Sequence, residues 1–163
     1  RSRVDLSNVC MVSPDAGRIR VAEKWSAKLG GCPLAFVHKT RDTTRPNVAV
    51  ANRVVGDVAG KQCVMVDDMI DTAGTISEAV KVVMNAGASS VIVAATHGIL
   101  SDPAAQRLSE CGAQEVIVTD TLPIALEKRF DKLTILPIAP LLARAIREVF
   151  DDGSVTSLFD GVA

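Results

Sequence analysis

Short apolar runs alternate along this chain with stretches in which apolar residues recur every three or four positions. The runs have the length of buried β-strands, and the three-to-four spacing is that of amphipathic helices. Strands that alternate with helices predict an α/β fold, in which helices flank a parallel sheet. We expect strands at residues 9–12, 34–37, 53–55, 63–66, 91–95, 116–118 and 133–136, and helices at 18–29, 75–86, 103–111 and 140–150.

Two segments depart from this alternation. Residues 39–50 are polar, rich in Lys, Arg and Thr, and interrupted by Pro46, which predicts a mobile loop or a weak hairpin. Residues 155–159 follow the last helix, and their apolar content predicts a terminal edge strand.

The composition supports a buried parallel sheet. Hydrophobic residues make up 48% of the chain, but only 3% of it is aromatic, so the core consists mainly of Val, Ile, Leu and Ala. Central strands of a parallel sheet are buried on both faces and favour such residues. The length of 163 residues fits one domain, 1–163. Because the chain begins with Arg1 and a strand pattern follows almost at once, we expect it to be part of a longer protein.

Charge, hydropathy and cysteine spacing exclude several classes of protein. The net charge of −1 argues against binding to nucleic acid, and no apolar run approaches the ~20 residues of a membrane span. The four cysteines lie far apart, without a CxxC pair, so we expect no cysteine-based metal site. Free, mostly buried thiols are typical of a cytoplasmic protein.

The segment Val64–Thr75 carries the strongest chemical signal. An apolar strand is followed by Asp67 and Asp68, and then by Asp71-Thr-Ala-Gly-Thr75 at the start of a helix. A loop that opens a helix exposes backbone N–H groups that attract an anion, and Gly74 permits close approach of the backbone. Residues Asp71, Thr72, Ala73, Gly74 and Thr75 therefore predict a phosphate site.

The adjacent acids extend this interpretation to a sugar phosphate. Carboxylates accept hydrogen bonds from vicinal hydroxyl groups and bind Mg²⁺, so Asp67 and Asp68 next to a phosphate loop predict recognition of a pentose 5-phosphate. The alternative from the residues alone is that Asp67, Asp68 and Asp71 cap the helix and hydrate a loop.

The same segment resembles the phosphoribosyl-diphosphate signature of the type I phosphoribosyltransferase fold. Other segments occur in an order that resembles the C-terminal domain of ribose-phosphate diphosphokinases of the bacterial, phosphate-activated kind, and the resemblance covers essentially the whole chain. These segments are Val12–Gly17, Val37–Arg41, Ala95–Gly98, Ser101–Pro103, Val118–Pro123 and Ser154–Phe159.

The resemblance implies a reaction. In that family a two-domain subunit transfers the β,γ-diphosphate of ATP to the 1-hydroxyl of ribose 5-phosphate and releases AMP. The resemblance also assigns Asp67 and Asp68 to the ribose hydroxyls, residues 71–75 to the 5-phosphate, Asp15 to magnesium, and Lys39 and Arg41 to a flexible catalytic loop, with Arg41 also binding ribose 5-phosphate. Ser154, Thr156 and Phe159 match a segment that helps to bind regulatory phosphate or ADP.

The resemblance further implies partners. They are ATP, ribose 5-phosphate, Mg²⁺, the N-terminal half of the same subunit, and other subunits of a homohexamer. Because the ATP-binding half is missing from this sequence, we expect the chain alone to be inactive. Two departures from the family pattern are Arg18, which replaces a frequent second glycine, and a longer segment between Lys39 and Val50.

Other functions share this fold, so the signature alone does not name the reaction. A base phosphoribosyltransferase would use the same loop, and a non-catalytic regulatory subunit of the synthetase would keep the fold. A nucleic-acid-binding regulator would need a basic face. We expect His38 to be structural or loop-facing, and His97 to be a hydrogen-bonded histidine rather than a residue lining a cleft.

Overall fold

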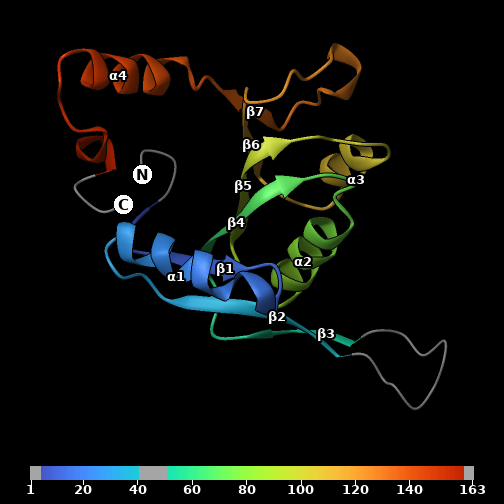
Figure 1. Cartoon of the computed structure of the whole chain (residues 1–163). Coiled ribbons are helices and arrows are strands. Elements are labelled where there is room, and N and C mark those ends of the chain that lie inside the picture. The colour runs from blue at the N-terminus through green and yellow to red at the C-terminus, as the bar shows by residue number, and fades with distance from the viewer. Residues whose placement is uncertain (1–4, 41–50, 160–163) are drawn as a thin grey trace.

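The computed structural model describes residues 5–40 and 51–159. Its helices and strands alternate along the chain, as Figure 1 shows. They are β1 (Val9–Ser13), η1 (Ala16–Arg18), α1 (Ile19–Lys28), β2 (Leu34–Thr40), β3 (Ala51–Val55), β4 (Gln62–Ile70), α2 (Gly74–Asn85), β5 (Ser90–Gly98), α3 (Ala104–Glu110), β6 (Glu115–Thr119), η2 (Leu126–Lys128), β7 (Leu133–Leu136), α4 (Ala139–Phe150) and η3 (Val155–Phe159), where η denotes a 3-10 helix.

The strands form a seven-stranded sheet in the order β3-β2-β1-β4-β5-β6-β7. Neighbouring strands run parallel except for β2 and β3, which pair antiparallel as a hairpin at one edge. The chain order changes direction between β1 and β4, which is the place where open α/β sheets bind ligands at the carboxyl ends of their strands. The topology therefore predicts a binding site at the carboxyl ends of β1 and β4.

The core lies in the middle of this sheet. Every residue of β1 is buried, and β4 and β5 are buried along most of their length. Helix α1 packs on one face of β1, β2 and β4, whereas α2 and α3 cover the other face (Figure 1). Strands buried on both faces account for the long apolar runs in the sequence.

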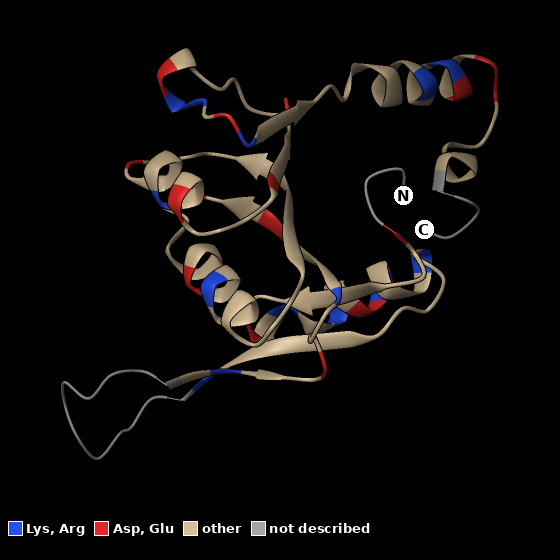
Figure 2. Cartoon of the chain, turned by 180° about the vertical axis from the view of Figure 1, so that it is seen from behind, with Lys and Arg blue, Asp and Glu red and all other residues tan. Residues whose placement is uncertain are grey.

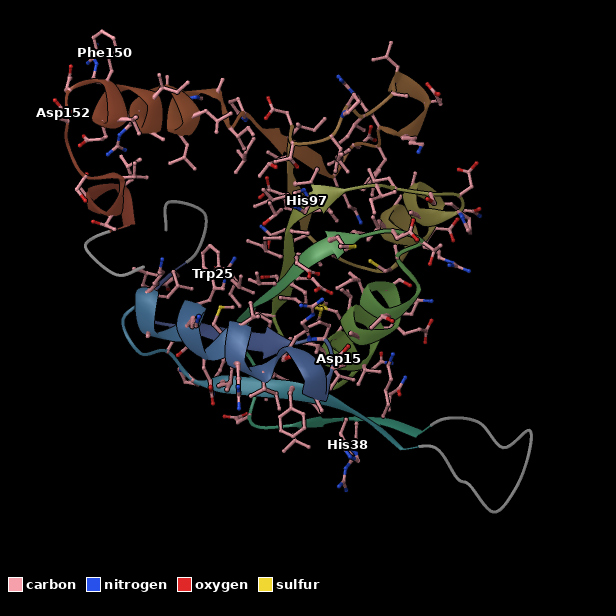
Figure 3. The ribbon with its side chains drawn as sticks, in the orientation of Figure 1. Asp15, Trp25, His38, His97, Phe150 and Asp152 are labelled. Carbon is pink, nitrogen blue, oxygen red and sulfur yellow. The ribbon has the colours of Figure 1, made fainter. Side chains whose placement is uncertain are left out.

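Helix α4 stands apart from this core. It projects from the end of β7, away from α2 and α3, and contacts η3 at its far end (Figure 1). None of its residues is buried, and its apolar side chains are exposed, including Phe150, which points outward in Figure 3. Its start is attached to the sheet by Asp120, whose Oδ1 accepts the N–H of Ile138 at 2.8 Å.

The predicted α/β class and parallel sheet are confirmed, with three refinements. Residues 155–159 form the 3-10 helix η3, so the predicted edge strand is wrong. Strand β4 continues to Ile70, so Asp67 and Asp68 belong to a strand and not to a loop. Lys39 and Thr40, at the start of the polar segment 39–50, pair with Asn52 and Ala51 in the β2–β3 hairpin, and the rest of that predicted loop lies outside the described residues.

Three further expectations concern the cysteines, the charges and the hydropathy of the chain. Cys10, Cys32, Cys63 and Cys111 are free, and all except Cys32 are buried. Acidic and basic residues are interspersed along the described helices and turns and are not separated by sign (Figure 2). In the described part of the chain, every helix is too short or too polar to cross a membrane.

Candidate functional site

The predicted phosphate loop lies between β4 and α2. Helix α2 begins at Gly74, directly after the N-cap residue Ala73, and no side chain caps it. The first N–H groups of a helix have no partner within the helix, and together with the helix dipole they favour an anion. The loop borders a pocket of about 230 Å³. Its lining residues are Asp15, Arg18, Asp67, Met69, Ile70, Asp71, Thr72, Ala73, Gly74, Thr75 and Ile76.

Ala73 gives the loop its sharp turn. Its φ of 59° and ψ of 11° are left-handed, a conformation that disfavours residues with a Cβ. The side chain of Ala73 is nevertheless buried, and its carbonyl oxygen accepts the N–H of Ser77 at 2.9 Å. The turn is thus fixed by packing below it, while Asp71, Thr72 and Thr75 remain exposed around the loop.

Arg107 holds the same loop from α3. Its Nη1 donates a 2.9 Å hydrogen bond to the carbonyl oxygen of Thr72. A Cβ built on Gly74 would lie 3.6 Å from that Nη1, so the guanidinium also lies close to the start of α2. Arg107 therefore brings a positive charge and a fixed hydrogen bond to the predicted anion site, a role that the sequence alone did not indicate.

The two acids lie at the end of β4, where the strand passes into the loop. Asp67 pairs with Ala95 of β5, and its side chain is 15% exposed, against 46% for Asp68. Oδ1 of Asp67 accepts the N–H of Asp68 at 2.8 Å, and Oδ1 of Asp68 accepts the N–H of Met69 at 2.8 Å. Asp67 is thus the more enclosed acid and lines the pocket.

Arg18 pairs with both acids. Its Nη2 lies 2.8 Å from each carboxylate oxygen of Asp68, and its Nε lies 3.2 Å from Oδ1 of Asp67. Burial raises the pKa of Asp67 above its usual range. Desolvation also opposes ionisation of Asp68, but hydrogen bonding to Asp67 and Arg18 outweighs it and lowers the pKa of Asp68. The two neighbouring carboxyls therefore differ in how readily they ionise.

Asp15 reaches the same pocket from the end of β1 and lies close to η1 in Figure 3. Its Oδ1 accepts the N–H groups of Gly17 at 2.9 Å and Arg18 at 3.2 Å, and thereby caps η1. Within residues 5–40 and 51–159, no three His, Cys, Asp or Glu side chains cluster closely enough to hold a metal ion by themselves. Mg²⁺ commonly uses one or two carboxylates and completes its shell with water and substrate phosphate, so Asp15 fits such a shared site.

The remaining predicted site residues lie farther from the pocket or outside the described part. Lys39 is exposed near the end of β2, three residues beyond Phe36, the last β2 residue that pairs with β1. Arg41 lies outside the described residues. Ser154 and Thr156 share a 2.5 Å hydrogen bond beyond α4, and Phe159 ends η3.

His97 is hydrogen-bonded, as predicted. Its Nδ1 lies 2.8 Å from Oγ1 of Thr121, and Thr121 in turn donates to the carbonyl oxygen of Thr96 at 3.2 Å. This network joins the ends of β5 and β6. His97 is therefore engaged with its neighbours and is not among the residues that line the pocket.

Similarity to known proteins extends over almost the whole chain. Residues 8–160 match the family described as phosphoribosyl synthetase-associated domain. A ribose-phosphate pyrophosphokinase of Bifidobacterium longum is 72% identical over 155 residues, which are 95% of this chain and 46% of that protein. One from Mycobacterium tuberculosis is 67% identical over 96% of this chain and 48% of that protein. The chain thus spans about half the length of the curated relatives it matches.

Solved structures give the same outline. A phosphoribosylpyrophosphate synthetase from Mycobacterium smegmatis superposes with a TM-score of 0.80 and 61% identity, over 91% of this chain and 47% of that chain. An orotate phosphoribosyltransferase from Aeropyrum pernix, at 17% identity, superposes with a TM-score of 0.54 over 85% of this chain and 66% of that chain. The second likeness concerns the fold alone, which is the predicted type I phosphoribosyltransferase fold.

Proposed function

The chain belongs to the phosphoribosyl synthetase-associated domain family, and on that basis we propose that it forms the ribose 5-phosphate-binding half of a ribose-phosphate pyrophosphokinase. The observation that carries the proposal is one pocket lined both by the uncapped start of α2 and by the enclosed carboxylate of Asp67. An anion site next to a hydroxyl acceptor matches a phosphorylated sugar.

Different residues of the pocket bind the phosphate and the sugar of ribose 5-phosphate. The backbone N–H groups at the start of α2, with the hydroxyls of Thr72 and Thr75, bind the 5-phosphate, and Arg107 keeps Thr72 in place. Asp67 accepts hydrogen bonds from the ribose hydroxyls. The 1-hydroxyl oxygen then attacks the β-phosphorus of ATP, the bond to the α,β-bridging oxygen breaks, AMP leaves, and the hydroxyl loses its proton.

Charge stabilisation is the main demand of this transfer. Asp15 would hold Mg²⁺ together with phosphate oxygens of the substrates, and the ion would supply positive charge that stabilises the transferred diphosphate. Lys39 stands on the hairpin beside the carboxyl ends of the central strands, and together with Arg41 it would close over the transferred diphosphate.

The complete reaction requires more than this chain. ATP is bound by the other half of the longer protein, and the subunits assemble as a homohexamer. We expect the chain alone to bind ribose 5-phosphate without making phosphoribosyl diphosphate. Ser154, Thr156 and Phe159 would contribute to a site for regulatory phosphate or ADP in that assembly.

Titration calorimetry with ribose 5-phosphate tests the proposal directly. The wild-type chain should bind ribose 5-phosphate, and ribose without the phosphate should bind at least about tenfold more weakly, because the charged contacts at α2 are lost. Asp67→Ala should weaken ribose 5-phosphate binding, whereas exchange of the exposed Arg20 should not. Absence of ribose 5-phosphate binding in the wild type would overturn the proposal.

Two assays separate the alternative activities. The chain incubated with ATP, Mg²⁺ and ribose 5-phosphate should release no AMP, and the full-length protein should release it. A base phosphoribosyltransferase would instead consume phosphoribosyl diphosphate in the presence of adenine or uracil. A non-catalytic regulatory subunit would leave the full-length protein without either activity.

A further inference from the structure

Arg18, which lines the pocket, makes ion pairs with both acids at the end of β4. Its guanidinium extends from the end of η1 to β4, where Nη2 contacts both oxygens of Asp68 at 2.8 Å. The contact from Nε to Oδ1 of Asp67 is longer, at 3.2 Å. One cation thus bridges two carboxylates that are adjacent in the sequence, and it contacts Asp68 more closely than Asp67.

Without Arg18, these acids would form an attractive site for a divalent cation. Adjacent carboxylates are typical ligands of Mg²⁺ and Mn²⁺, and their mutual repulsion is relieved by a bound cation. The guanidinium of Arg18 already supplies positive charge at this position. A metal ion that approaches Asp67 and Asp68 must therefore displace the guanidinium or be repelled by it. At separations of about 4 Å such like-charge repulsion remains substantial even near a protein surface.

Resting on the proposed function, we infer that Arg18 is an internal counter-cation that keeps free divalent metal ions off the pair formed by Asp67 and Asp68. The metal ion would then bind between substrate phosphate oxygens and Asp15, which also lines the pocket. Asp67 stays available to the sugar hydroxyls because Arg18 is anchored mainly on Asp68. Arg18 therefore acts as a positioning residue that decides where in the pocket the metal ion binds.

The direct test is Mn²⁺ binding in the absence of substrate, followed by electron paramagnetic resonance of the free ion. Arg18→Gln removes the charge and keeps a polar side chain, and it should bind Mn²⁺ on the order of tenfold more tightly than the wild type. Arg18→Lys keeps the charge and should bind Mn²⁺ as weakly as the wild type. Arg20→Gln, an exchange at an exposed arginine two residues away, should also behave as the wild type.

A second substitution tests whether the added Mn²⁺ affinity comes from the two carboxylates. Arg18→Gln combined with Asp68→Asn should lose the added Mn²⁺ affinity, because one of the two carboxylates is gone. Arg18→Met must show the same gain as Arg18→Gln, which guards against an effect of the glutamine itself. The inference is overturned if neither neutral variant binds Mn²⁺ more tightly than the wild type, or if Arg20→Gln gives an equal gain.

Ribose 5-phosphate titrations of the same variants separate this inference from the proposed function. Failure of the wild type to bind ribose 5-phosphate would remove the proposed function and leave the Mn²⁺ comparison unchanged. Unchanged Mn²⁺ affinity in the neutral variants, with normal ribose 5-phosphate binding in the wild type, would remove only the role assigned to Arg18.

Discussion

The guanidinium of Arg107 donates a 2.9 Å hydrogen bond to the carbonyl oxygen of Thr72, although the two residues lie 35 positions apart in the sequence. Helix α3 thereby reaches over the start of α2 and fixes the loop that is proposed to bind phosphate. The contact joins the loop before α2 to helix α3, and strand β5 lies between α2 and α3 in the sequence.

Replacement of this guanidinium should weaken phosphate recognition. We expect Arg107→Gln to raise the Kd for ribose 5-phosphate about 3- to 10-fold, because an exposed arginine contributes a modest charge and one hydrogen bond. Calorimetric titration measures the change. Arg144→Gln removes an exposed arginine on α4 and should leave the Kd unaltered, and equal losses in both variants would contradict the role of Arg107.

The left-handed conformation of Ala73 should make this position sensitive to side-chain shape. Ala73→Val places a β-branched residue at positive φ in a buried position, so the unfolding free energy should fall by about 2 kcal/mol or more. Urea unfolding and ribose 5-phosphate titration should both register the change. Ala73→Gly tolerates the same φ and should keep ribose 5-phosphate binding within about threefold of the wild type.

The turn after the edge hairpin offers a matched pair of glycines. Gly56 has a φ of 111°, and an added Cβ would lie 2.8 Å from Cβ of Ala35, whereas Gly60 has a φ of 68° and nothing within 4 Å. Gly56→Ala should therefore lower the unfolding free energy by about 2–4 kcal/mol, and Gly60→Ala by only about 1 kcal/mol. Denaturant unfolding of both variants gives the comparison, and equal losses would refute the steric explanation.

The enclosed carboxyl of Asp67 predicts a stability that depends on pH. Burial raises its pKa above the ordinary value of 3.8, so the folded state binds the proton more readily than the unfolded state. The contribution of Asp67 to stability therefore falls as the pH rises from the unfolded pKa through the raised folded pKa. At neutral pH, Asp67→Asn should raise the melting temperature while it weakens ribose 5-phosphate binding.

Thermal unfolding of the wild type and of Asp67→Asn at several pH values checks this expectation. The two proteins should converge well below pH 3.8, where Asp67 is protonated in both the folded and the unfolded state. A stabilisation that is the same at all pH values would show that its cause is not the ionisation of Asp67.

Hydrophobic patterning was enough to predict the sheet and its helices, because the central strands are buried on both faces and α1, α2 and α3 each bury one face. The hydrophobic pattern did not predict the end of β4, where Asp67 and Asp68 have the polarity of a loop but continue the strand. Asp67 pairs there with Ala95 of β5. Local polarity cannot reveal that pairing, since the partner strand follows a whole helix later.

The candidate site was predictable as far as it is local in sequence. Residues 71–75 are contiguous, so their spacing alone indicated the start of a helix and an anion site. In the sequence, Arg18 stands out only as a departure from the family pattern, because its contact with Asp68 spans 50 residues. Arg107 gave no signal, since an exposed arginine on a helix has the pattern of any solvated side chain.

Helix α4 has none of its residues buried, and what ties it to the sheet is its first turn, through Asp120 and Ile138. The part of the chain that folds as one cooperative unit therefore ends with β7, and α4 is a separable appendage. Shortening the chain after Leu136 should leave the unfolding transition of the sheet in place, whereas removal of β1 and α1 would abolish it.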